Sequence, residues 1–187
     1  MIDVRLQTPF SLIMAGPSNS GKTTLLINIL KSKQTLFTTQ PVKTRMYFSI
    51  WQPSYDYMRE NKLVDDFVEG VPSASDLTTF QKSVPKTLII FDDLAEQLST
   101  AISDFFIAGC HHYDSNVILI SQNLFQKNPI WRVCSLNTTY MILLKNPRDP
   151  SQVSTISRQA FPGQKNFLSS VCKYCSFLIY VFKFTSD

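Results

Sequence analysis

The segment that most constrains the fold is residues 16–23, GPSNSGKT, because it satisfies the pattern G-x-x-x-x-G-K-[ST]. A short apolar run at residues 11–15 (SLIMA) precedes it, and leucine and isoleucine recur at helical spacing over residues 21–30. In such a unit the glycines let backbone amides turn toward phosphate oxygens, and the helix presents its positive N-terminal end to the same anion. The sequence therefore predicts a phosphate-binding loop (P-loop) between a buried strand and a helix.

The P-loop also predicts the cofactors. Lys22 can reach the β- and γ-phosphates of a nucleotide, where it would take part in catalysis, and the hydroxyl of Thr23 can ligate magnesium. We therefore expect ATP and Mg²⁺ to bind here. The residues predicted to contact the nucleotide are Gly16, Pro17, Ser18, Asn19, Ser20, Gly21, Lys22, Thr23 and Thr24.

Two adjacent carboxylates follow a second apolar run, residues 87–91 (TLIIF). In open α/β sheets, ligands bind at the carboxyl ends of the strands. There Asp92 can hold magnesium through water, and Asp93 can orient and deprotonate the water that attacks the γ-phosphate. The alternative is that one of them caps the next helix, because Asp is a favoured N-cap residue.

A third apolar run, residues 117–120 (VILI), leads into Ser121, Gln122 and Asn123. If this strand lies between the P-loop strand and the acidic strand, Gln122 would face the γ-phosphate and could bind the attacking water or a phosphate oxygen. The alternative is a polar strand end that leads into a loop. The local sequence leaves both interpretations open.

Apolar runs and helical patterns along the rest of the chain predict the architecture. Strands are expected at residues 11–15, 45–51, 87–91, 117–120, 140–144 and 176–184. Helices are expected at 21–30, at 151–160 and through Leu94, Leu98, Ile102, Phe105, Phe106 and Cys110, with short helices and loops over 52–86. Strands that alternate with helices indicate a three-layer α/β fold with a mostly parallel sheet flanked by helices. We expect one domain, residues 1–187.

Composition limits the classes of protein that remain. Hydrophobic residues make up 44% of the 187 residues and charged residues 17%, which is typical of a folded globular protein. The net charge of +4 is compatible with a polyanionic partner without establishing one. No apolar run approaches the ~20 residues of a membrane span, and the N-terminus has no pattern of a secretory signal, so we expect an intracellular protein. Cys172 and Cys175 form one C-x-x-C pair, whereas zinc needs about four ligands, so reduced thiols are expected.

Arginines are candidates for a catalytic role between subunits. A ring ATPase often receives an arginine from the neighbouring subunit, because the charge that spreads over the γ-phosphoryl group needs a fixed cation. Arg132 and Arg148 are the candidates, and Arg158 is a weaker third.

Together these motifs resemble the FtsK–HerA superfamily of P-loop ATPases, and most closely the viral DNA-packaging ATPases of polinton-like and adintovirus-like elements, virophages and poxvirus-type viruses. The resemblance extends over about residues 11–165. It rests on GPSNSGKT, on LIIFDDL (88–94), on HHYDSNVILISQNLF (111–125), on SLNTTYMILLKNPRD (135–149) and on QVSTISRQAFPGQ (152–164).

This resemblance implies a RecA-like (ASCE) fold and ATP-driven translocation of double-stranded DNA into a capsid by a homo-oligomeric ring. Its implied partners are double-stranded DNA and a capsid or portal-vertex protein, and it supports Gln122 as a sensor of the γ-phosphate. Relatives usually close with a further helix and strand, so residues 166–187 are expected to be divergent or truncated.

Other P-loop classes fit less well. A small-molecule kinase would carry an arginine-rich lid, but residues 124–140 contain only Arg132. No N-K-x-D of a regulatory GTPase and no LSGGQ-like signature of an ABC ATPase occurs in the chain. A nucleotide-binding protein without turnover remains an open alternative.

Overall fold

A seven-stranded sheet forms the centre of the molecule in the computed structural model, which describes residues 5–146, 148–149, 151–160 and 179–184. The strand order is β3-β2-β4-β5-β1-β6-β7. Six strands run parallel, and β7 pairs antiparallel with β6. The strands are β1 (Ser11–Ala15), β2 (Lys43–Phe48), β3 (Asp66–Glu69), β4 (Thr87–Asp92), β5 (Asn116–Ser121), β6 (Tyr140–Leu144) and β7 (Ile179–Lys183). The predicted mostly parallel α/β sheet is confirmed.

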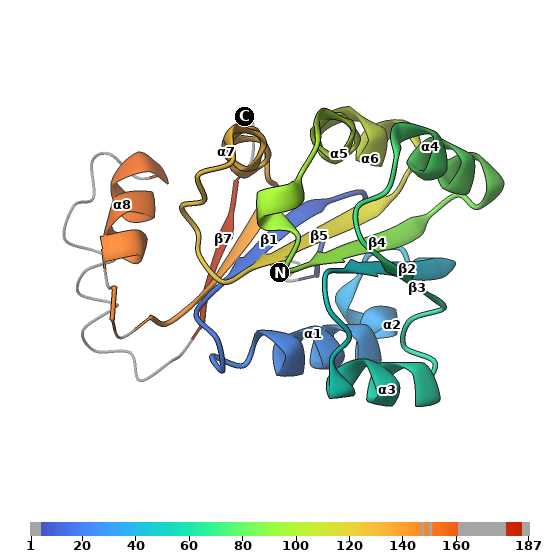
Figure 1. Ribbon diagram of the computed structural model, residues 1–187, viewed down its shortest axis with the longest axis horizontal. Helices are drawn as coiled ribbons and strands as arrows, with labels where there is room; N and C mark the ends of the chain where they lie inside the picture. Colours follow the sequence, from blue (N-terminus) through green and yellow to red (C-terminus); the bar gives the residue numbers. More distant parts are fainter. Residues whose placement is uncertain (1–4, 147, 150, 161–178, 185–187) are drawn as a thin grey trace.

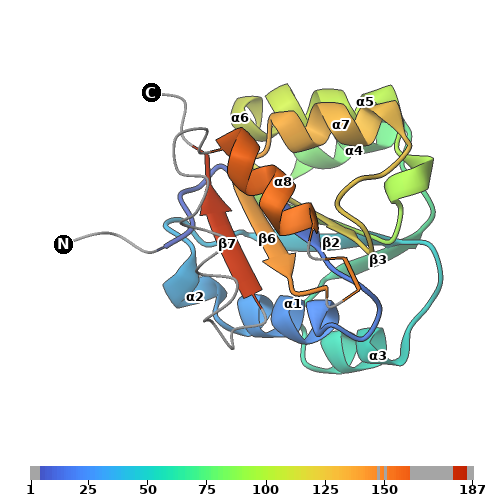
Figure 2. The same cartoon turned by 90° about the vertical axis from the view of Figure 1, so that its left-hand side faces the viewer.

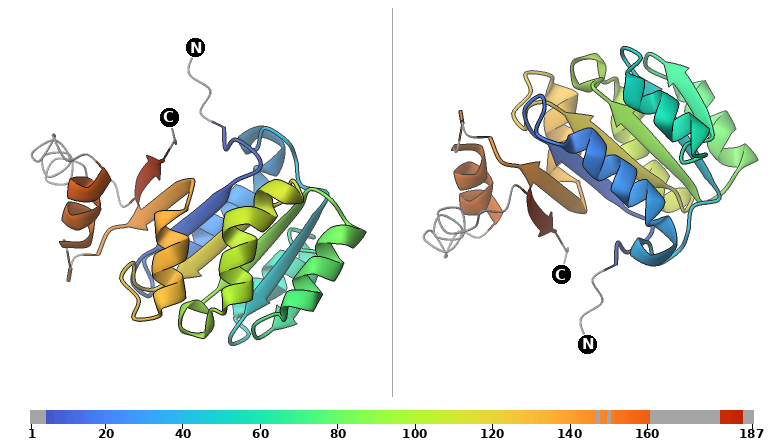
Figure 3. Two further views of the ribbon diagram at one scale, coloured as in Figure 1. Left: turned by 90° about the horizontal axis from the view of Figure 1, so that it is seen from above. Right: turned by 90° about the horizontal axis from the view of Figure 1, so that it is seen from below.

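Helices cover both faces of this sheet, so the fold has three layers (Figures 1 and 3). One face carries α1 (Lys22–Lys31), α2 (Lys33–Leu36) and α3 (Pro53–Glu60). The other carries α4 (Ala74–Ser83), α5 (Thr100–Asp104), the π-helical turn η2 (Phe105–Gly109), α6 (Cys110–His112) and α7 (Pro129–Leu136). Helix α8 (Ser151–Ala160) follows β6, and Figure 2 looks onto β6, β7 and α8. Within the described ranges, no helix combines the length and apolar character that crossing a bilayer requires.

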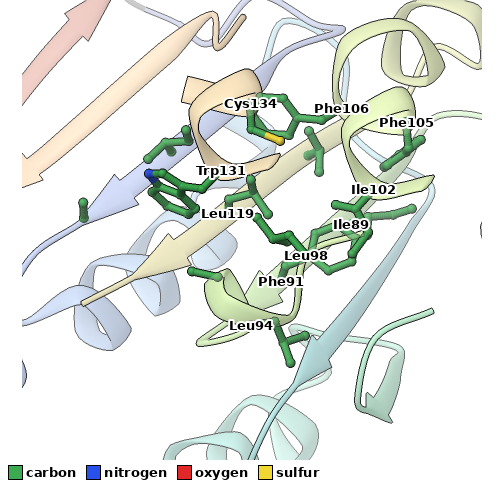
Figure 4. Packing of buried hydrophobic residues seen from close by; sticks show 14 of the residues in the cluster. Ile89, Phe91, Leu94, Leu98, Ile102, Phe105, Phe106, Leu119, Trp131 and Cys134 are labelled. Atoms are coloured by element: carbon green, nitrogen blue, oxygen red, sulfur yellow. The ribbon is translucent and has the colours of Figure 1, made fainter. Parts of the chain in front are cut away.

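Alternating side chains along each central strand build two cores. In β4, Leu88 and Ile90 join the core under α1 and α3, whereas Ile89 and Phe91 join the core under α4 to α7. Successive side chains of a strand point to opposite faces, so an uninterrupted apolar run is what a strand covered on both faces needs. Figure 4 shows the second core, where Trp131 of α7 packs near the strands.

Several predicted bounds differ from the structure. The strand expected at residues 45–51 ends at Phe48, and Pro53 then takes the first position of α3, which its fixed φ favours. The region expected to hold only helices and loops contains the short edge strand β3. The helix expected from Leu94 begins only at Thr100, because a 3-10 turn, η1 (Ala95–Gln97), comes first.

Asn128 joins the start of α7 to this turn. Its Nδ2 donates to the carbonyl oxygens of Ala95, Glu96 and Leu98 at 3.3, 3.2 and 3.2 Å. Its Oδ1 accepts from the backbone N–H of Ile130 at 2.9 Å, which caps the helix. One side chain therefore satisfies several backbone groups that secondary structure leaves unpaired.

Asn128→Ala is expected to lower the free energy of unfolding by about 2 kcal/mol, because the cap and the bonds to the turn are lost together. Urea denaturation measures this change. Asn137→Ala is the matched control: Asn137 lies at the other end of α7, is exposed and donates to the carbonyl of Val133 at 2.8 Å. Equal losses of stability in both variants would contradict a special role for Asn128.

Candidate active site

The strand order brings the predicted motifs to one edge of the sheet. β5 pairs in parallel with both β1 and β4, so it lies between the P-loop strand and the acidic strand. This is the arrangement that the Gln122 hypothesis requires. The carboxyl ends of these strands open into a cleft of about 460 Å³. Its walls are formed by Ser18, Asn19, Gly21, Lys22, Thr23, Thr24, Gln52, Asp92, Asp93, Ser121 and Gln122.

The P-loop backbone depends on two of its glycines. Gly21 has φ 95°, a left-handed conformation that side chains with a Cβ rarely adopt. At Gly16 a Cβ would lie 2.7 Å from Cβ of Leu144 and 2.9 Å from Oγ of Ser20. The loop therefore packs directly against the end of β6. Of the predicted nucleotide contacts, Gly16, Pro17 and Ser20 belong to the loop but not to the cleft wall.

Polar groups of the loop fit a triphosphate. Nζ of Lys22 donates to the carbonyl oxygens of Gly16 at 2.6 Å and Pro17 at 2.8 Å, which holds the ammonium group at the loop. Burial lowers the pKa of Lys22, and the nearby carboxylates of the acidic pair act against that shift. The hydroxyl of Ser20 is buried without a hydrogen-bond partner among the described residues. The Ser20 hydroxyl does not line the cleft, so it is the ammonium group, in a loop that opens a helix, that suits an anionic ligand.

Asp92 is the buried member of the acidic pair. It ends β4, is 6% exposed, and its Oδ2 accepts a hydrogen bond of 2.7 Å from the hydroxyl of Tyr55. Burial raises the pKa of Asp92, and the bond from Tyr55 partly offsets that effect. Thr23 lines the same cleft, so a hydroxyl and a carboxylate are available there as oxygen ligands of the kind Mg²⁺ prefers.

Asp93 is the exposed member of the pair. Its backbone has φ 56°, and its N–H donates to the carbonyl of Ile120 at 3.2 Å. Nε2 of Gln122 lies 3.3 and 3.1 Å from its two carboxylate oxygens, while Oε1 of Gln122 accepts from Oγ of Ser18 at 3.1 Å. The chain Ser18–Gln122–Asp93 therefore spans the cleft from the P-loop to the second carboxylate.

The alternative role of these aspartates as helix caps does not hold. Leu94 precedes η1 and Ser99 precedes α5, and neither helical segment has a side-chain cap. Both carboxylates lie at the cleft instead.

Two residues at the start of α3 were not predicted from the sequence to belong to the site. Gln52, the residue before α3, lines the cleft. The hydroxyl of Tyr55, in the first turn of α3, donates a hydrogen bond to Asp92. A signal for Gln52 was available, because it follows β2, whose carboxyl end faces the same edge of the sheet as that of β4. Tyr55 carried no such signal, because its contact depends on how α3 packs.

The arginine candidates lie outside the cleft of their own subunit. Arg132 on α7, Arg148 after β6 and Arg158 on α8 are all exposed, and none of them lines the cleft. Cys172 and Cys175 fall outside the described residues.

Comparison with known proteins identifies the family of this chain. No curated protein matches the chain. The sequence profile of the family described as "Poxvirus A32 protein" matches residues 3–156, which is more than half of the chain and includes the P-loop, the acidic pair and Gln122. The chain therefore belongs to the poxvirus A32 family of viral packaging ATPases.

Proposed function

We propose that this protein is an ATP-hydrolysing motor that moves double-stranded DNA during the packaging of a viral genome. The family supports packaging, and one observation in the molecule supports turnover. The hydrogen-bonded chain Ser18–Gln122–Asp93 joins the P-loop to a carboxylate across a single cleft. In this proposal residues 1–187 act as one ATPase domain inside the host cell.

The P-loop would bind the triphosphate of ATP. Backbone amides of residues 16–24 would surround the phosphate oxygens, and Lys22 would turn from its own carbonyl partners to the β- and γ-phosphates. Thr23 and Asp92 would hold Mg²⁺, Asp92 through water. The bound ion would neutralise charge on the β- and γ-phosphates.

Asp93 would act as the general base. It accepts a proton from a water whose oxygen bonds to the γ-phosphorus, and the bond to the β–γ bridging oxygen breaks to give ADP and phosphate. Gln122, held between Ser18 and Asp93, would orient that water and respond to the γ-phosphate. Binding of the γ-phosphate at Ser18 would compete with the bond from Ser18 to Gln122.

A ring of subunits would complete the site. Arg132 and Arg148 are exposed and stand away from the cleft of their own subunit, which suits an arginine that acts on the nucleotide of a neighbour. A capsid or portal-vertex protein would anchor the ring.

ATP hydrolysis with and without duplex DNA, measured over a range of protein concentrations, tests this function. We expect DNA to raise the rate per subunit, with a further rise as protein concentration favours assembly. Added salt should weaken the DNA effect, because contacts to the phosphate backbone release counterions. ATP binding without hydrolysis at every concentration would contradict the motor and favour the alternative without turnover. Phosphate transfer to a small molecule instead of water would favour the kinase alternative.

A further inference from the structure

The segment after β2 is close to the acidic pair although it is distant in sequence. Phe48, the last residue of β2, is the register partner of Asp92, the last residue of β4. The chain then turns, and α3 begins at Pro53 on the face of the sheet that also carries α1. This path places the first turn of α3 beside the cleft, where Gln52 lines the wall.

Tyr55 makes the specific contact from this helix. Its side chain is fully buried, with 0% exposure, and its hydroxyl donates to Oδ2 of Asp92 at 2.7 Å. A phenol that is otherwise enclosed by apolar groups needs a partner for its hydroxyl, and a carboxylate is a strong acceptor. Among the described residues, Tyr55 is the one side chain that hydrogen-bonds the Asp92 carboxylate.

Aromatic packing fixes the position of Tyr55. Its ring centroid lies 5.4 Å from that of Phe48, 5.5 Å from that of Trp51 and 6.0 Å from that of Phe67. The guanidinium carbon of Arg59, one turn further along α3, lies 4.2 Å from the ring centroid of Trp51. These contacts restrict the ring of Tyr55, so the direction of its hydroxyl is set by the packing of α3.

We propose that Tyr55 is a positioning residue for magnesium: its hydroxyl holds Oδ2 of Asp92 and thereby orients the carboxylate, with Oδ1 left for the water shell of the ion. The inference rests on the proposed Mg·ATP site. Partners that hydrogen-bond a metal-binding carboxylate fix its orientation, and their loss typically weakens metal binding by about 10- to 100-fold. Tyr55 does not touch the nucleotide, so its effect must pass through Asp92.

Tyr55→Phe tests this inference because it removes only the hydroxyl. The affinity of the protein for a non-hydrolysable ATP analogue is measured by calorimetry over a series of free Mg²⁺ concentrations, and in EDTA. We expect the Mg²⁺ concentration that gives half of the affinity gain to rise about 10-fold or more, while the affinity in EDTA stays at the wild-type value. Tyr57→Phe is the matched control: Tyr57 lies on the same helix, is 39% exposed and packs under Lys31. It should leave the Mg²⁺ titration unchanged.

A double-mutant comparison separates positioning from general loosening of the fold. In an Asp92→Asn background, Tyr55→Phe should cause no further change in the Mg²⁺ titration, whereas a loosened fold would add its own effect. A wild-type Mg²⁺ titration in folded Tyr55→Phe would overturn the inference alone. If the nucleotide affinity of the wild-type protein does not change with Mg²⁺ concentration, both the inference and the proposed site are wrong. DNA plays no part in these measurements, so a failed motor function would be recognised separately.

Discussion

Asp93→Asn is expected to bind Mg·ATP with wild-type affinity and to hydrolyse it about 10²- to 10⁴-fold more slowly. The amide cannot accept the proton of the attacking water, whereas its oxygen can still accept the bond that Gln122 donates to Asp93. Asn also tolerates the left-handed backbone at this position, where φ is 56°. The substitution therefore removes the base with little change to the backbone of the cleft.

Nucleotide binding by calorimetry and single-turnover hydrolysis test Asp93→Asn together. Asp104→Asn is the matched control, because Asp104 is exposed on α5 and does not line the cleft. It should show wild-type binding and turnover. Normal hydrolysis by Asp93→Asn would show that another group takes the proton, and the order of roles within the acidic pair would then be wrong.

Lys22→Ala is expected to weaken ATP binding by at least about 10²-fold, because charge-assisted hydrogen bonds to two phosphates are lost. Turnover should fall further, since the ammonium group also stabilises charge on the γ-phosphoryl group. Among the described residues, Nζ of Lys22 donates to two loop carbonyl oxygens, and the nearby carboxylates of the acidic pair act on its charge. These are not core contacts, so the substitution should leave the fold intact.

Equilibrium binding of ATP and AMP distinguishes a loss of phosphate contacts from a general loss of affinity. We expect Lys22→Ala to affect ATP strongly and AMP little. Lys31→Ala provides the control, because Lys31 is exposed at the far end of the same helix, α1. ATP affinity at the wild-type level in Lys22→Ala would rule out the P-loop assignment.

The central strands were predictable because a short, uninterrupted apolar run is compatible with few structures other than a buried strand. The predicted bounds of β1 and β6 and of α8 agree with the structure, and the strands before the acidic pair and before Gln122 differ from prediction only at their ends. Burial on both faces favours apolar residues at successive positions, so the central residues of such strands form continuous apolar runs. The P-loop was predictable for a different reason: its glycines stand at fixed spacing, Gly21 because of its left-handed backbone and Gly16 because a Cβ would meet Leu144.

Other elements depend on contacts that no local pattern encodes. β3 has only four residues and lies at the sheet edge, with Val68 and Glu69 exposed, so its sequence carries no apolar run. The start of helix α7 has a recognisable signal, Asn128 followed by Pro129, although no helix was predicted there. The contact between Tyr55 and Asp92 joins residues 37 positions apart, and only the packing of α3 on the sheet brings them together.

The antiparallel strand β7 limits how copies of this protein can meet. Through the five residue pairs of its register, β7 occupies the hydrogen-bonding edge of β6, so a neighbouring copy cannot extend the sheet along β6 itself. On that side β7 is then the outer strand among the described residues, and Val181 at the centre of its register is 63% exposed. A contact between two copies through the backbone on that side would therefore have to use β7 and not β6.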